Sequence, residues 1–235
     1  MKKKSLLEIS VEALKAAVAA ERGGADRIEL CSDLAVGGLT PQTALLRAVR
    51  QRIQIPIFAM IRPRAGDFVY SPAEFAQMKK SLAEARDAGA SGLVFGILNP
   101  DHTVDIDRTR ELVELARPLP VTFHRAFDEC SDLSQALDNV ERLGASRILT
   151  SGGAASALEG ATNIAMLVAA AGERVTIVTA AGIHAGNILQ LAKTTRAQEF
   201  HSGLSSVLPH GQTDYVRFEK AVRAMAKMLS PLVSE

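Results

Sequence analysis

The segment GASRILT at residues 144–150 repeats a pattern that occurs twice earlier, as GADRIEL at residues 24–30 and GASGLVF at residues 89–95. Each copy places a glycine directly before an apolar run, and glycine readily adopts the left-handed conformation that ends a helix. The copies start 65 and 55 residues apart, which is about two strand-and-helix units each. This spacing predicts the second, fourth and sixth strands of an eightfold repeat, the pattern of a (β/α)8 TIM barrel.

Eight parallel strands are expected, each followed by a helix. They are expected at residues 5–10, 27–31, 55–62, 92–98, 121–125, 147–151, 175–180 and 198–201. Helix starts are predicted at Thr40-Pro41 and at Ser71-Pro72, where an N-cap residue precedes a proline, and Glu74 completes a capping box with Ser71. A doubly wound open sheet is the main alternative, but no Gly-x-Gly-x-x-Gly follows the first expected strand.

Length and composition agree with one barrel domain over residues 1–235, since a TIM barrel takes about 250 residues. Lys and Arg number 27 against 26 Asp and Glu, so the net charge of +1 provides no general attraction for nucleic acid or membranes. The chain has two cysteines, Cys31 and Cys130, and no apolar run of transmembrane length. We therefore expect a soluble cytoplasmic protein without a disulfide framework, and a homo-oligomer as the default for an intracellular barrel.

Strand alternation assigns polar side chains to faces of the sheet, because residues two apart lie on the same side. If the apolar neighbours face the helices, six polar side chains face the barrel interior: Glu8, Glu29, Cys31, His124, Glu199 and His201. Arg62, directly before Pro63, is expected to join them from the rim. Unpaired charges inside a barrel cost several kcal/mol each, so the carboxylates are expected to face Arg62, His124 and His201.

Two interpretations of this polar set are open. Charged residues at strand ends are often only solvated, and a lone histidine is more often structural than catalytic. A convergent set of mixed charge instead predicts a pocket for a small polar ligand.

Small residues in the last three expected strand-to-helix loops predict an anion site. In barrel enzymes an anion often rests on backbone amides of these loops. The candidate anion-binding residues are Arg64, Ser151, Gly152, Gly153, Gly182 and Ser202. An enzyme with this site would transfer a proton on, or hydrolyse, a small anionic substrate. His124 or His201 would be the general base, Glu29 or Glu8 its partner, and Arg62 would hold the anion.

Several motifs in order resemble the CutC copper homeostasis family. They are RIELC at residues 27–31, GGLTP at 37–41, MIRPR at 60–64, TFHRAFD at 122–128 and RILTSG at 147–152. The resemblance runs from Glu8 to Phe218 and implies a cytoplasmic TIM-barrel protein to which copper binding is attributed. The glycine-rich turn usual in the family after the seventh strand reads TAAGI here, at residues 179–183, which puts a close backbone approach of an anion at Ala180 or Ala181 in doubt.

The residue chemistry gives copper one candidate ligand. Copper(I) prefers thiolate and thioether ligands, but the chain has no Cys-x-x-Cys and no methionine-rich cluster. Cys31 ends a strand beside Glu29 and is the candidate ligand, against the alternative of an ordinary buried thiol. Cys130 is expected to be a poorer ligand, because Asp128 and Glu129 would raise its thiol pKa. Three functions remain open: a copper-binding protein, an enzyme acting on a small anion, and a barrel with a merely solvated mouth.

Overall fold

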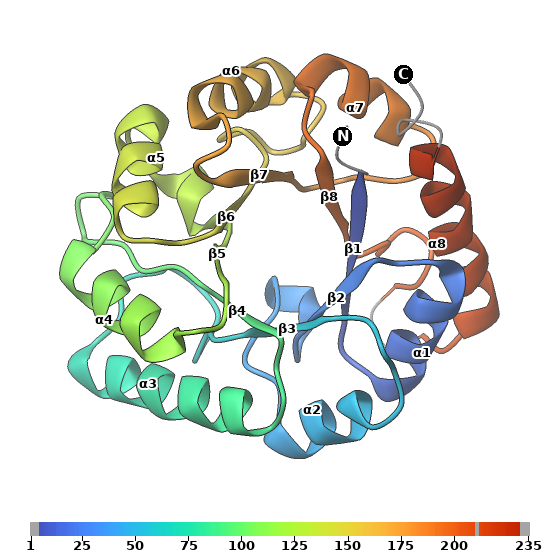
Figure 1. Cartoon of the computed structure of the whole chain (residues 1–235), viewed down its shortest axis with the longest axis horizontal. Helices are drawn as coiled ribbons and strands as arrows, with labels where there is room; N and C mark the ends of the chain where they lie inside the picture. The colour runs from blue at the N-terminus through green and yellow to red at the C-terminus, as the bar shows by residue number, and fades with distance from the viewer. Residues whose placement is uncertain (1–4, 210–211, 231–235) are drawn as a thin grey trace.

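The computed structural model describes residues 5–209 and 212–230 and forms a closed barrel of eight parallel strands (Figure 1). Each strand pairs with the next in chain order, and β8 pairs with β1. The strands are β1 (Leu6–Val11), β2 (Arg27–Leu30), β3 (Ile57–Met60), β4 (Gly92–Phe95), β5 (Val121–Phe123), β6 (Arg147–Thr150), β7 (Thr176–Thr179) and β8 (Glu199–Ser202). The predicted (β/α)8 fold is confirmed.

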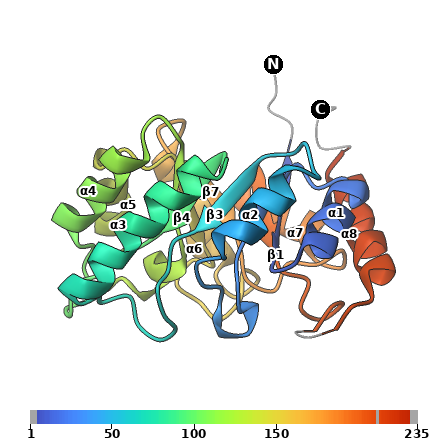
Figure 2. The ribbon, with the colours of Figure 1, turned by 90° about the horizontal axis from the view of Figure 1, so that it is seen from below.

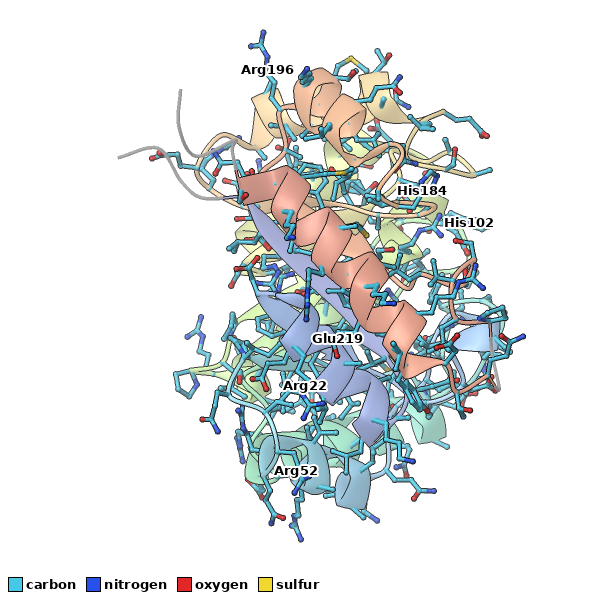
Figure 3. The ribbon with its side chains drawn as sticks, turned by 90° about the vertical axis from the view of Figure 1, so that its right-hand side faces the viewer. Arg22, Arg52, His102, His184, Arg196 and Glu219 are labelled. Atoms are coloured by element: carbon cyan, nitrogen blue, oxygen red, sulfur yellow. The ribbon has the colours of Figure 1, made fainter. Side chains whose placement is uncertain are left out.

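One α-helix follows each strand, and together the helices form the outer ring of Figure 1. They are α1 (Leu14–Gly23), α2 (Thr43–Arg50), α3 (Pro72–Asp87), α4 (Ile106–Ala116), α5 (Leu133–Arg142), α6 (Ala161–Ala171), α7 (Ile188–Thr195) and α8 (Tyr215–Leu229). Two short 3-10 helices, η1 (Leu34–Val36) and η2 (Arg125–Glu129), lie in the loops after β2 and β5. The ring closes where α8 packs against α1, as Figures 1 and 3 show.

The capping prediction holds for α3 and fails for α2. Ser71 accepts a hydrogen bond from the Glu74 N–H, and the Glu74 side chain accepts one from the Ser71 N–H, which completes the capping box. Helix α2 begins at Thr43 instead of Pro41. The Thr40 hydroxyl is engaged elsewhere, since it donates to the Arg62 carbonyl and accepts from the Arg62 N–H. Thr40 therefore ties the loop after β2 to the chain that leaves β3.

The sheet separates two packed regions. A large apolar core lies between the strands and the helices, while a smaller cluster inside the barrel contains Cys31, Phe58, Met60 and Val94. Gly92 pairs with Phe58 in the register, and a Cβ at Gly92 would lie 2.5 Å from the Phe58 ring. The missing side chain at Gly92 thus makes room for the ring inside the barrel.

The loops that follow the strands gather at one end of the barrel. In the side view of Figure 2 the loop after β2, drawn in blue, projects beyond the strands at the lower edge. None of the helices that the structure describes has the length and apolar run that crossing a bilayer requires.

Candidate functional site

A cavity of about 410 Å³ opens at the carboxyl end of the barrel. Its wall is formed by strand ends, and its rim by the loops after β2, β5, β7 and β8. The charged and imidazole side chains of its lining are Glu29, Arg62, His124, Arg125, Asp128, Glu129 and His201. Four of the five expected catalytic residues therefore lie around one cavity, and the fifth, Glu8, lies one layer deeper.

Below the cavity, four charged side chains cross-link the barrel interior. Glu8 pairs with Arg27 and, at 2.7 Å, with Nη2 of Arg147. Glu199 Oε2 lies 2.5 Å from Arg27 Nη2 and 3.1 Å from Arg147 Nε. Both guanidinium groups lie over the Phe58 ring, with Cζ 4.8 and 4.6 Å from its centroid. Paired charges and the ring fill this layer, so the barrel has a closed floor.

The charge partners differ from those expected from the sequence. Of the three expected partners, only His201 contacts a carboxylate within residues 5–209 and 212–230, whereas Arg62 and His124 do not. The main partners are Arg27 and Arg147, each the first residue of its strand. Both have the inward alternation phase, two residues before Glu29 and Leu149, so the signal for their role was present in the sequence.

A carboxyl–imidazole–carboxyl chain rises from the floor into the cavity. His201 Nδ1 lies 2.7 Å from Glu8 Oε1, and its Nε2 lies 3.8 Å from Glu29 Oε2. Burial alone would raise the pKa of Glu8, but Arg147, Arg27 and His201 hold it well below its usual range. Burial also raises the pKa of Glu29, and its Oε1 is buried without a hydrogen-bond partner among the described residues. Burial would lower the pKa of His201, but the carboxylates of Glu29 and Glu8 raise it.

His124 is a neutral imidazole on the wall of the cavity. Its Nδ1 accepts a hydrogen bond of 3.2 Å from the Ala126 N–H at the start of η2. The proton of the neutral ring therefore lies on Nε2, which is buried and has no partner in the described part of the chain. Burial and the nearby charge of Arg62 lower the pKa of His124 to about 3. The expected role as general base does not suit so weak a base, whereas donation from Nε2 does.

The two expected anion-binding arginines differ in position. Arg62 lines the cavity, but its Nη atoms donate to the backbone carbonyls of Val36, Gly38 and Gly66, which leaves Nε buried and unpartnered within the described chain. Arg64 pairs with Glu74 and Asp67 and does not line the cavity. Arg125 does line it, because β5 ends at Phe123 and strand alternation no longer applies there.

The loop after β6 already holds an anion, the carboxylate of Asp128. Its Oδ1 accepts hydrogen bonds from the Thr150 hydroxyl, the Ser151 N–H and the Gly153 N–H. The Gly152 N–H donates to the Thr150 hydroxyl. The expected anion-binding amides of this loop therefore have partners within the chain. Asp128, which the sequence did not suggest as a member of this site, occupies the position where an external anion would bind.

The loops after β7 and β8 leave backbone donors open to the cavity. Ala181 and Gly182 both have positive φ, 78° and 72°, and neither N–H donates a hydrogen bond to a residue that the structure describes. The Ala180 N–H donates to the Thr150 carbonyl and is not available. Ser202 lines the cavity, and its hydroxyl donates to the Ile183 carbonyl. The turn that departs from the family pattern thus keeps a left-handed shape even with alanine at position 181.

The soft-metal ligands lie apart. Cys31 is fully buried, and its Sγ lies 3.5 Å from Glu29 Oε2. Burial and Glu29 raise its thiol pKa well above the usual value. Cys130 donates to the Ala126 carbonyl instead, and burial, with Asp128 and Glu129, raises its pKa to about 12. Neither cysteine is therefore a preformed thiolate.

Comparison with known proteins gives a consistent picture. The CutC family model matches residues 5–206. A human protein named copper homeostasis protein cutC homolog is 44% identical over 225 residues, which are 96% of this chain and 81% of the human protein. A CutC family protein from Xanthomonas campestris pv. campestris strain 8004 is 46% identical over 196 residues, which are 83% of this chain and 82% of that protein.

Solved structures agree with the sequence matches. The crystal structure of CutC from Streptococcus agalactiae superposes with a TM-score of 0.81 at 31% identity and covers 85% of this chain and 98% of its own. Thiamine phosphate pyrophosphorylase from Pyrococcus furiosus superposes with a TM-score of 0.64 at 15% identity, covering 98% of this chain and 97% of its own. The second likeness shows the shared barrel fold alone.

Proposed function

Because this chain belongs to the CutC family, as its motifs predicted, we propose that it works at the carboxyl-end cavity, where it binds a small anionic ligand and transfers a proton on it. One observation carries the proposal. Glu29 Oε1, His124 Nε2 and Arg62 Nε are buried around the cavity without partners among the described residues. Buried polar groups without partners are costly, so their presence in a cavity favours a ligand that satisfies them.

Each residue has a role in this proposal. Glu8, held ionised by Arg27 and Arg147, positions His201 through Nδ1. The other His201 nitrogen lies 3.8 Å from Glu29 Oε2, so His201 acts on Glu29 through its charge, and Glu29 meets the ligand. At the mouth Arg125 is paired with Asp128 at 2.8 Å, so the groups that support an anionic ligand are the charge of Arg62 and the open N–H groups of Ala181 and Gly182.

Thermal melts with inorganic phosphate and 2-phosphoglycolate test ligand binding. A ligand that binds only the native state stabilises it by about 2.7 kcal/mol at 100 times its Kd. We expect 2-phosphoglycolate to raise the wild-type melting temperature and the effect to be lost in Arg62→Met. The exposed histidine variant His102→Asn, outside the cavity, should keep the effect. If neither anion raises the wild-type melting temperature, the proposal fails and the structural interpretation of the mouth gains support.

Copper ion binding is the second candidate function, favoured by the family name and by the contact of Cys31 with Glu29. Within the described chain, the ligand atoms of Glu8, Glu29 and His201 lie within 4.8 Å of one another. The fit is incomplete, because Glu8 already pairs with two arginines and the thiol of Cys31, which lies beside this set at Glu29, is protonated. Copper would be cargo here, and it would have to displace the Cys31 proton.

Copper(I) titration against a competing chelator tests this second function. The affinity should fall in Cys31→Ser and stay unchanged in Cys130→Ser, since Cys130 lies in another loop and bonds to Ala126. Unchanged affinity in both variants would remove the thiolate mechanism. We also propose a cytoplasmic homo-oligomer, to be checked by cell fractionation and by light scattering of the purified protein.

A further inference from the structure

The unpartnered polar atoms around the cavity include both hydrogen-bond donors and an acceptor, and this combination limits the chemical class of the ligand. Glu29 Oε1 is an acceptor, while His124 Nε2 and Arg62 Nε carry protons. The three residues are 3, 3 and 6% exposed, so bulk water does not satisfy these atoms. A ligand that fits must therefore present a proton to Glu29 and an acceptor atom to His124.

The structure fixes the donor at His124 rigidly. Its Nδ1 is held by the Ala126 N–H, and the Phe68 ring lies 4.8 Å from the imidazole centroid. Gly96 gives the ring its place, because a Cβ there would lie 2.6 Å from Nδ1. A neutral imidazole held in this way can donate a hydrogen bond from Nε2 to a carbonyl oxygen.

Glu29 faces the same cavity from a different part of the barrel. It belongs to β2, whereas His124 follows β5, and β3 and β4 lie between them in the sheet. A ligand in the cavity can therefore touch both groups with different atoms. We propose, building on the proposed function, that the ligand is a small carbonyl compound bearing a phosphate or carboxylate, and that Glu29 removes a proton from the carbon next to the carbonyl.

The reaction balances without an oxidant or a metal. The C–H bond breaks, and its proton goes to the Glu29 carboxylate. The electron pair forms a carbon–carbon double bond, and the carbonyl electron pair moves onto oxygen, which receives the hydrogen bond from His124 Nε2. In an α-hydroxy carbonyl compound, His124 Nε2 gives its proton to the enolate oxygen and takes the proton of the neighbouring hydroxyl, and return of the proton from Glu29 to the other carbon then gives an isomer. Return of the proton to the same carbon exchanges or inverts it.

The rest of the cavity suits the anionic group. The free N–H groups of Ala181 and Gly182 line it, as does Arg62, whereas Arg125 is paired with Asp128. A volume of about 410 Å³ lies within the range of small-molecule sites, roughly 300 to 1,000 Å³. The loop after β6 is excluded as the anion site, since Asp128 occupies its amides.

Hydrogen–deuterium exchange tests this chemistry. Purified protein in D2O is incubated with dihydroxyacetone phosphate and with pyruvate, and loss of the C–H signals next to the carbonyl is followed by proton NMR. We expect exchange with at least one of the two probes. Glu29→Gln should slow it by about 100-fold or more, because it removes the base. His124→Asn should slow it by about 100-fold, because asparagine can still cap Ala126 but is too short to present the Nε2 donor.

The control variant is His102→Asn, which should exchange at the wild-type rate. Equal exchange in wild type, Glu29→Gln and His124→Asn would point to a contaminating enzyme and overturn the inference. Stabilisation of the wild type by 2-phosphoglycolate without exchange of either probe would overturn the inference and leave anion binding in place. Absence of both stabilisation and exchange would overturn the inference and the proposed function together.

Discussion

At the scale of single residues, surroundings decide what each titratable group can do. The mouth holds two histidines, but His201 lies between carboxylates that raise its pKa, whereas His124 is buried near Arg62 and has its pKa lowered to about 3. The sequence offered both as possible bases on equal terms. Their different roles come from contacts with residues far away in the chain, such as Glu8, and the sequence alone did not show these contacts.

The lowered pKa of His124 predicts a stability change with pH. In the unfolded chain this histidine takes up a proton near pH 6.5, while in the folded protein it stays neutral down to about pH 3. The unfolded state therefore binds the extra proton between these values, and stability falls as pH falls through that window. The loss approaches about 1.4 kcal/mol per pH unit.

Urea unfolding at several pH values from 7 to 4 measures this loss. His124→Asn lacks the titrating group, so its free energy of unfolding should fall less steeply than that of the wild type. His102→Asn, a variant at an exposed histidine, should follow the wild type. Parallel curves for the wild type and His124→Asn would contradict the assignment of a neutral, buried His124.

At the scale of elements, strand alternation predicted more than capping signals did. Every expected strand is present, and Glu8, Glu29, His124 and His201 all contribute to the interior or mouth of the barrel, because alternation is a local property of any strand. The start of α2 was mispredicted because the Thr40 hydroxyl bonds to the Arg62 backbone, a contact between distant segments. Alternation does not place Arg125, which lines the cavity, because β5 ends after three residues.

The contact of the first and last helices gives a prediction at this scale. Figure 3 shows α8 lying against α1, with Arg22 and Glu219 labelled near the crossing. A Cβ on Gly23 would lie 2.6 Å from the Val222 Cβ and 2.9 Å from the Glu219 carbonyl oxygen. Gly23→Ala should therefore push the two helices apart and destabilise the fold by about 1 to 3 kcal/mol, despite the better helix propensity of alanine.

Chemical denaturation of Gly23→Ala and of Arg22→Ala measures this effect. Arg22 is exposed, and its contact with Arg223 uses only the Arg22 carbonyl, so Arg22→Ala should change stability by less than about 0.5 kcal/mol. A Gly23→Ala protein as stable as wild type would show that the helices can separate at little cost.

At the scale of the whole molecule, the charged floor connects parts of the chain that are distant in sequence. Arg147 on β6 bridges Glu8 on β1 and Glu199 on β8. Neither strand is a neighbour of β6 in the sheet, because β7 lies between β6 and β8. Removing one partner of a buried pair leaves an uncompensated charge. Arg147→Met should therefore destabilise the protein by about 3 to 5 kcal/mol.

Two further variants make this test specific. Arg174→Ala removes an exposed ion pair with Glu141 and should change stability by about 1 kcal/mol or less. Without Arg147 the floor holds two carboxylates and one guanidinium, so Arg147→Met combined with Glu199→Gln removes the carboxylate in excess and should recover part of the loss. If Arg147→Met and Arg174→Ala lose equally little in thermal and urea unfolding, the floor is not held together by its charges.

The closed floor also leaves the cavity with a single open end. Because Phe58 and its flanking arginines block the far end, ligands enter and leave the cavity only at the loops. One ligand must dissociate before the next can bind, so substrate and product exclude each other from the cavity. An anion and a copper ion bound in that space exclude each other in the same way. Any two of them should compete in titrations, with each raising the apparent dissociation constant of the other in proportion to its own concentration.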